Sequence, residues 1–258
     1  MPRVCVLVPF HMDDASVANR RRQQRSVKLS PDMELEYKAV KAGPALLDSH
    51  HDYTLAHLSM LEAGLEAAEE GFDAICIDTT SDSGANALRS MLDIPIVSPG
   101  RASYLTALML GNRFSVLTQW DGWIPVYVNG VIELGLRHHL ASVRSINMMP
   151  DLENLLGGKE DVVFPLLREQ GLQCVNDGAD VICLGSTTMH DAHAYLSENL
   201  PVPVINPGPL TYKLAETLLS LGLTQSRRAF PRPNVPKPEM IHAMIAAAAR
   251  TEASSAAT

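Results

Sequence analysis

The sequence predicts an α/β protein built as two similar lobes with mainly parallel sheets. Short apolar runs alternate with longer segments of helical spacing, which is the pattern of βαβ units. One stretch of the chain also recurs about 107 positions further on, and 258 residues suffice for two small lobes. We therefore expect two pseudo-symmetric Rossmann-like lobes with a ligand cleft between them, residues 1–97 with 208–258 forming the first and residues 98–207 the second.

The expected strands are short apolar runs bounded by turn residues. They cover residues 4–9, 34–40, 73–78, 94–97, 114–118 and 143–148, and the alternation of strand and helix resumes from 180 to 221. Helical spacing fills residues 54–70, 82–92, 101–110, the segment after 118 up to 136, and 152–177 with a break at Gly157 and Gly158. Four prolines between 231 and 238, followed by an Ala- and Ser-rich end, predict a strap and then a loose terminus.

The internal repeat is carried by two separate stretches. Residues 73–81 (DAICIDTTS) match residues 180–188 (DVICLGSTT), and residues 95–100 (PIVSPG) match residues 203–208 (PVINPG) after a slip of one position. Tyr104 then matches Tyr212. Any two βαβ units share their alternation, but not a matched cysteine, hydroxyl triplet, Pro-Gly pair and tyrosine. Each copy is expected to run strand, hydroxyl-rich turn, helix, strand and helix.

Composition excludes several classes of function. The net charge of −8 and the 5% aromatic content argue against a nucleic-acid surface. The one basic run, residues 20–25, is expected to be a solvated helix face, with an anionic partner as the alternative. No signal peptide or transmembrane segment is found, so we expect a cytoplasmic protein. The four cysteines form no CxxC pair and are expected to be buried, reduced thiols. No Gly-rich phosphate loop is found either, and no metal or cofactor is expected.

The two hydroxyl triplets mark the expected site. In open parallel sheets, ligands bind beyond the carboxyl ends of the strands, where the following helices present backbone N–H groups. The triplets are Thr79, Thr80 and Ser81 in the first copy and Ser186, Thr187 and Thr188 in the second. They can cap helices and bind an anion or carbonyl oxygen at the same time. We expect them to face each other across the cleft.

Six pieces of the chain, in order and at the right spacing, carry a resemblance to a known family. They are Gly43-Pro44, 79–84, 116–118, 184–189, 203–206 and 221–226. Over about residues 3–225 the sequence resembles the aspartate/glutamate/hydantoin racemase superfamily, and best its hydantoin racemase branch. The resemblance implies cofactor-free chemistry at a carbon next to a carboxylate or imide carbonyl, with the turns as a dioxyanion hole, and a homo-oligomer, either dimer or tetramer.

The sequence departs from the family pattern at the two positions that carry catalytic cysteines in racemases. Thr79 stands at the first and Ser186 at the second. A thiol with a pKa of about 8.5 is readily tuned to a thiolate, whereas an alcohol is a poor base unless a neighbour takes its proton. Cys76 and Cys183 lie three residues earlier, inside the strands. Two-thiol racemisation is therefore not expected.

Few other ionisable groups lie near the predicted turns. Asp82 is expected as a catalytic carboxylate or a helix N-cap, and His190 as an acid or base. His51 begins the long helix and either reaches the ligand or lies on the surface. Thr118 and Tyr127 are expected to line the site, with core packing as the alternative for the tyrosine.

Three functions remain open at this point. The first is a racemase-like isomerase, in which His190 or an acid replaces the thiols and the turn hydroxyls stabilise an enolate-like oxyanion. The second is a cofactor-free decarboxylase, lyase or hydrolase, in which Ser186 is a donor or nucleophile. The third is a binding protein that has lost the reaction. Because the polar triplets match in both copies, we favour an enzyme for a small anionic or imide substrate, with no nucleic acid or membrane partner.

Overall fold

The computed structural model describes residues 1–149 and 160–255 and divides into two compact units. Unit 1 comprises Met1–Asp78, Asp82–Ser98 and the chain from Thr211 onwards. Unit 2 comprises Thr79–Ser81 and the described part of Pro99–Leu210. Each unit contains one parallel four-stranded sheet with helices on both sides, so the predicted α/β class is confirmed.

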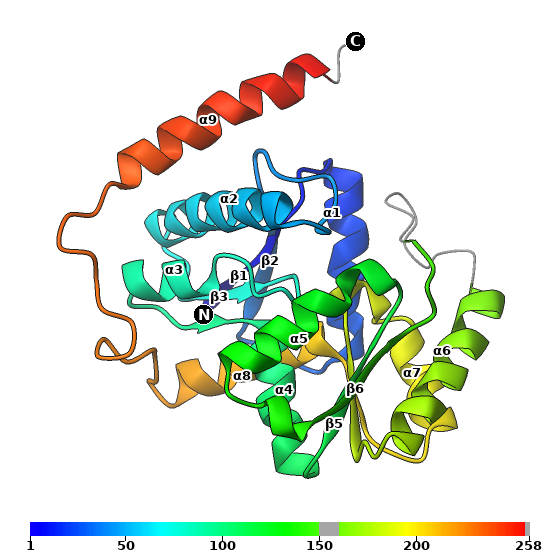
Figure 1. Cartoon of the computed structure of the whole chain (residues 1–258). Coiled ribbons are helices and arrows are strands. Elements are labelled where there is room, and N and C mark those ends of the chain that lie inside the picture. Colours follow the sequence, from blue (N-terminus) through cyan, green and yellow to red (C-terminus); the bar gives the residue numbers. More distant parts are fainter. Residues whose placement is uncertain (150–159, 256–258) are drawn as a thin grey trace. The chain divides into compact units, whose positions relative to one another are not determined.

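Unit 1 is built on the sheet β2-β1-β3-β4 (Figure 1). Its strands are β1 (Arg3–Val8), β2 (Glu34–Ala39), β3 (Ala74–Ile77) and β4 (Ile96–Val97). Its helices are α1 (Asp14–Arg20), the 3-10 helix η1 (Arg21–Ser26), α2 (His50–Glu69), α3 (Ala85–Met91), the larger part of α8 (Pro207–Ser220) and α9 (Pro238–Ser255). One core joins β1 and β3 to α2 and α3, through side chains such as Leu7, Met60, Ile75 and Leu88. Burial of these apolar side chains is the main source of stability.

Unit 2 repeats this plan in the sheet β6-β5-β7-β8. Its strands are β5 (Phe114–Thr118), β6 (Leu140–Ser145), β7 (Val181–Leu184) and β8 (Val204–Ile205). Its helices are α4 (Pro99–Leu110), η2 (Asp121–Trp123), α5 (Ile124–Glu133), η3 (Arg137–His139), α6 (Glu160–Asn176), η4 (Thr187–Met189) and α7 (Ala192–Asn199). One face of the sheet packs against α4 and α5 and the other against α6 and α7 (Figure 1). Both faces are therefore covered, as a parallel sheet requires.

The two copies of the repeat exchange their last helices. The helix of the first copy, α4, lies in unit 2, and most of the matching helix α8 lies in unit 1. As a result, the strand cysteine of each copy contacts the helix of the other copy. Cys76 Sγ lies 3.6 Å from the carbonyl of Thr211 in α8, and Cys183 Sγ lies 3.7 Å from the carbonyl of Ser103 in α4. The duplication seen in the sequence is thus also present in the side-chain contacts.

Several sequence predictions differ from the structure. The strand expected over 143–148 covers Leu140–Ser145 instead, because Asn147 has a φ of 50° and cannot continue a strand. The expected helix over 152–177 is observed from Glu160, and its first part, with the break at 157–158, lies outside the described residues. No helix of the described residues is long and apolar enough to span a bilayer.

The basic run is not simply a solvated face. Arg20 Nη1 lies 3.3 Å from Asp78 Oδ2, and Gln23 Nε2 lies 3.2 Å from Asp78 Oδ1, all three side chains being buried. The expectation of a solvated helix was wrong for these two residues, because spacing alone did not show that a buried carboxylate would face them. A charge removed from water needs such partners.

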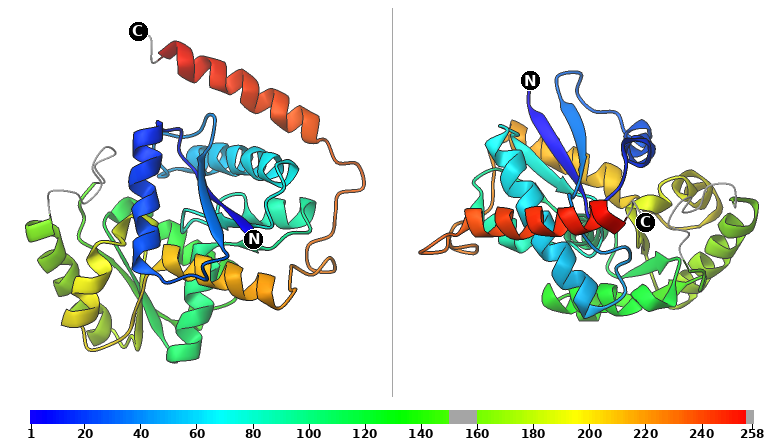
Figure 2. Two further views of the ribbon diagram at one scale, coloured as in Figure 1. Left: turned by 180° about the vertical axis from the view of Figure 1, so that it is seen from behind. Right: turned by 90° about the horizontal axis from the view of Figure 1, so that it is seen from above.

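The chain end is also more ordered than expected. Residues 238–255 form α9 rather than a loose terminus, since alanine has the highest helix propensity. α9 lies alongside α2 in both views (Figures 1 and 2), and His242 Nδ1 lies 3.1 Å from Oε1 of the buried Glu62. Ile245 is buried in the same contact region. These contacts fix the helix to unit 1.

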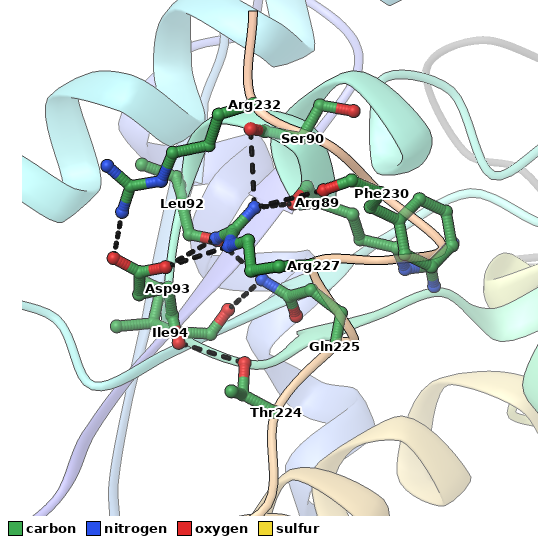
Figure 3. Close-up of polar contacts among 10 residues, drawn as sticks. All are labelled: Arg89, Ser90, Leu92, Asp93, Ile94, Thr224, Gln225, Arg227, Phe230 and Arg232. Carbon is green, nitrogen blue, oxygen red and sulfur yellow. Dashed lines mark hydrogen bonds and ion pairs between the residues drawn. The ribbon is translucent and has the colours of Figure 1, made fainter.

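The predicted strap precedes α9 and is held by two arginines, Arg227 and Arg232, which both pair with Asp93 (Figure 3). Arg227 Nε and Nη2 lie 2.9 and 2.6 Å from Asp93 Oδ1, and the guanidinium also donates to the carbonyls of Arg89, Leu92 and Phe230. Gln225 Nε2 donates to the carbonyl of Leu92 as well. Arginine suits this role because its donors are arranged in a rigid fork.

We predict that Arg227→Ala lowers the free energy of unfolding by about 1–2 kcal/mol, because carbonyl groups of unit 1 lose charged donors that are only partly replaced by water. Urea unfolding and limited proteolysis between 224 and 237 measure the effect. Arg228→Ala is the matched control, since that residue is exposed one position further on. Equal proteolysis of both variants would show that Arg227 does not anchor the strap.

Candidate active site

The two hydroxyl turns have the same internal geometry. Thr79–Ser81 follows β3, and Ser186–Thr188 follows β7. In the first turn the hydroxyl oxygens of Thr79 and Ser81 are 3.0 Å apart, and in the second those of Ser186 and Thr188 are 2.8 Å apart. The first and third hydroxyl of each triplet are therefore paired in both copies.

The turns also contact each other within unit 2. The Thr80 hydroxyl donates to the backbone carbonyl of Gly185, the residue immediately before Ser186. Tyr127 Oη donates to the same carbonyl at 2.7 Å. Because the single Tyr127 proton is used there, the 2.9 Å contact between Thr118 Oγ1 and Tyr127 Oη has Thr118 as its donor. A chain of hydroxyl groups thus fixes the tip of β7 beside the first turn.

Thr118 and Tyr127 are held inside unit 2 by this chain. Both are buried, and the tyrosine packs in the core between the sheet and α4 and α5. Their hydroxyl protons are used in positioning the Gly185 carbonyl. Both residues therefore lie next to Gly185, which precedes the second turn, and the substrate contacts suggested for them stay predictions.

Gly185 allows the close approach of the tyrosine. A Cβ atom at this position would lie 2.9 Å from Thr118 Cβ and 2.9 Å from both Cζ and Oη of Tyr127. Contacts of this length are repulsive, and neither neighbour is the flexible end of a long side chain. Only glycine therefore permits the observed hydrogen bond from Tyr127.

We predict that Gly185→Ala lowers the free energy of unfolding by about 1–3 kcal/mol, the usual effect of overpacking, and displaces the second turn. Chemical denaturation and the tyrosine near-ultraviolet spectrum measure these changes. Gly130→Ala is the control, because its added Cβ would approach only Tyr104 Cε2, at 3.9 Å. Equal stability of the two variants would contradict this packing argument.

Ser186 has a defined structural role at the start of η4. Its Oγ accepts from the Thr188 N–H at 3.2 Å, as an N-cap does. Thr187 and Thr188 are buried, whereas Ser186 is partly exposed. The cap leaves the turn with backbone and hydroxyl donors that are already oriented, which is the arrangement needed for stabilising a developing oxyanion.

His190 ends η4, two residues before α7 begins. Its side chain is 11% exposed, and its Nδ1 lies 3.2 Å from Asp191 Oδ1. A carboxylate on one ring nitrogen fixes the orientation of the ring. The nearby His193 is used differently, since its Nε2 lies 3.1 Å from the carbonyl of Val204.

Asp82 and His51 lie in unit 1. Asp82 follows the first turn with a left-handed φ of 54°, and its carbonyl accepts from the N–H of Ala85. His51 is exposed at the start of α2, where its Nδ1 lies 3.1 Å from Asp52 Oδ1. Hydrogen bonds from Ser49 and His51 hold the pKa of Asp52 below its usual range. The N-cap of α3 is Gly84, so the N-cap role suggested for Asp82 was wrong. The catalytic role suggested for Asp82 and the ligand contact suggested for His51 stay predictions.

Two features near the first turn were not predicted from the sequence. Gly84 donates its N–H to His57 Nδ1 at 2.9 Å, so Nδ1 of this histidine acts as an acceptor. Asp78, whose buried carboxylate accepts from Arg20 and Gln23, is the residue immediately before Thr79. The only sequence signal for this group was an aspartate at the end of an apolar strand.

The cysteines are unsuited to proton transfer. All four are free and buried. Desolvation raises the pKa of Cys76 to about 12, and burial raises that of Cys183 still further. Both thiols therefore stay protonated at neutral pH, because the charged form is disfavoured away from water.

We predict that iodoacetamide at pH 7–8 leaves the activity unchanged, because it reacts with thiolates and these thiols ionise only at far higher pH. Mass spectrometry of the native and urea-unfolded protein measures labelling, with the unfolded chain as the positive control. Rapid inactivation that coincides with labelling of Cys76 or Cys183 would restore a thiol to the mechanism.

Side chains that bind metals do not gather in the described part of the chain: no group of three or more His, Cys, Asp or Glu residues could hold an ion there.

Comparison with known proteins identifies a family that the chain matches. The model of the Asp/Glu/hydantoin racemase family matches residues 16–215. A hydantoin racemase from Pseudomonas sp. (strain NS671) is 30% identical over 228 residues, which cover 88% of this chain and 86% of that protein. Similarity of this extent covers both repeats.

Two solved structures are similar over nearly the whole chain. The allantoin racemase from Klebsiella pneumoniae has a TM-score of 0.82 at 25% identity, covering 92% of this chain and 95% of that one. The allantoin racemase from Pseudomonas fluorescens has a TM-score of 0.81 at 26% identity, covering 91% and 98%. The arrangement of strands and helices is thus shared with racemases.

Proposed function

Because the chain belongs to the Asp/Glu/hydantoin racemase family and is a racemase-like enzyme, we propose that it moves a proton at the carbon next to a carbonyl in a small carboxylate or imide. The reaction needs no cofactor and does not use two thiols. Hydantoin and allantoin, the compounds named for its relatives, are candidate substrates. The contact between the two duplicated turns, through Thr80 and Gly185, carries the proposal.

The turns stabilise the intermediate. When a proton leaves the carbon next to a carbonyl, negative charge moves to the carbonyl oxygen. The hydroxyls and amides of the two turns are oriented beforehand by their own hydrogen bonds, so they require little reorganisation. The groups proposed for this role belong to Thr79, Thr80, Ser81, Ser186, Thr187 and Thr188.

Proton transfer is assigned to His190. Asp191 holds its Nδ1, and the opposite nitrogen takes up or returns the proton. A neutral imidazole changes charge near physiological pH, which an alcohol such as Thr79 or Ser186 cannot do. Asp82, one residue beyond the first turn, is the proposed second acid–base group.

We predict that Ser186→Ala and Thr79→Ala each reduce turnover by about 10²-fold or more, the scale for one lost oxyanion donor. Ser197→Ala, an exposed serine of α7 in the same unit, is the matched control and is expected to keep full activity. Hydrogen–deuterium exchange of substrate followed by NMR gives the rates. Wild-type rates in both variants would remove these residues from the mechanism.

The same NMR assay in D₂O identifies the reaction. Deuterium at the carbon next to the carbonyl without net conversion indicates proton transfer. Loss of CO₂ from a substituted malonate indicates a decarboxylase, and ring opening indicates a hydrolase. The panel contains 5-methylhydantoin, allantoin, phenylmalonate and aspartate, and silence across the panel would contradict the proposed function.

A further inference from the structure

Two buried amide side chains flank the strand that carries the second turn. β7 lies between β5 and β8 in the sheet. Gln119 follows β5, two residues beyond the pairing of Leu117 with Leu184, and Asn206 follows β8 directly after Ile205, which pairs with Cys183. Gln119 and Asn206 therefore stand at the carboxyl edge of the sheet on either side of the tip that leads into Ser186.

Both amides have hydrogen-bonding atoms for which the described residues offer no partner. Among the described residues, Gln119 Oε1 and both Oδ1 and Nδ2 of Asn206 are buried without a partner. The side chains are 2% and 7% exposed. Buried polar atoms are nearly always paired, and one left unpaired lowers stability, so such atoms indicate a role in function.

The local sequence removes one of the two donors that Asn206 could use as a helix cap. An asparagine before a helix normally accepts from the N–H of the second or third helical residue. Here the helix begins Pro207-Gly208-Pro209, so the third residue has no N–H. The repeat offers a contrast: Ser98, which matches Asn206, accepts from Arg89 Nη2 at 2.9 Å. The two copies differ at this position.

The unpaired atoms define the kind of ligand that satisfies them. Two are acceptors and one is an NH₂ donor. A carboxylate offers only acceptors and leaves both amide oxygens unpaired, whereas an N–H group beside a carbonyl can pair with an amide side chain through both of its atoms. We propose that Asn206 and Gln119 are specificity-determining residues that select substrates with an amide or imide N–H edge over simple carboxylates.

This inference rests on the proposed function and adds residues that recognise the substrate away from the reacting carbon. Leaving a buried acceptor unpaired is costly, so a site built in this way rejects analogues that lack the N–H by a larger factor than a purely apolar pocket can. In this proposal the two turns stabilise the oxyanion, and the two amides determine which substrates bind.

The test compares 5-methylhydantoin with 1,3,5-trimethylhydantoin, which keeps the exchangeable carbon but has no N–H. Exchange in D₂O, corrected for the uncatalysed rate, gives kcat/KM for the wild type and for Asn206→Ala, Asn206→Asp and Gln119→Leu. Asn199→Ala, an exposed asparagine of α7, is the matched control. Thermal unfolding establishes which variants fold, and the Asp and Leu substitutions keep the size of the side chain.

We expect the wild type and Asn199→Ala to prefer the N–H compound by about tenfold or more, and the folded Asn206 and Gln119 variants to lose about ten- to hundredfold on that compound only. Equal losses on both compounds would assign the two amides a structural role and overturn the proposal, as would an unchanged preference.

If the wild type exchanges neither compound, that result contradicts the proposed function but does not test recognition by the two amides. Calorimetric titration with the same two hydantoins then decides the recognition step. Binding of 5-methylhydantoin that is weakened by methylation in the wild type but not in Asn206→Ala supports the inference, and equal binding of the two compounds, or none, overturns it.

Discussion

Two hydroxyl groups converge on the backbone carbonyl of Gly185, and the candidate site depends on this contact. Thr80 reaches the carbonyl from the first turn, and Tyr127 reaches it from the core, supported by Thr118. A carbonyl oxygen has two lone pairs, so both bonds can form at once. They fix the residue before Ser186 and bring two segments that are 105 positions apart in the chain into one arrangement. The absence of a side chain at Gly185 makes the contact with Tyr127 possible, because a Cβ would collide with Tyr127 and Thr118.

The duplication explains both what the two copies share and why their cysteines are inert. Each copy places a cysteine inside its strand, where the thiol meets a helix carbonyl contributed by the other copy. These positions are fully buried, and desolvation keeps the thiols protonated. The turns three residues later carry alcohols, which in our proposal stabilise negative charge at the strand tips while other groups transfer the proton. The group proposed for that transfer is His190, whose Nδ1 contacts Asp191 in the same unit.

The copies are not equivalent, and the differences are physically informative. A two-base mechanism benefits from symmetry, because each face of the substrate carbon needs one proton-transfer group. Here the residue before the first turn, Asp78, is in a buried ion pair with Arg20, whereas the residue before the second turn, Gly185, accepts from the Tyr127 hydroxyl. Ser98 is paired in the first copy, but its counterpart Asn206 is not. Such asymmetry suits a substrate whose two ends differ, and in our proposal recognition lies in unit 2, at the ends of β5 and β8.

The sequence by itself determined the parallel α/β class, the family, the duplication and both hydroxyl turns, because periodicity, turn chemistry and repeated residue types are local properties of the chain. It did not reveal that Arg20 and Gln23 face a buried carboxylate, that the alanine-rich end packs as α9 against Glu62, or that Thr80 binds Gly185. Each of these is a contact between residues far apart in the sequence. Only the tertiary structure decides them, since a polar side chain looks the same in sequence whether its partner is water or a buried group.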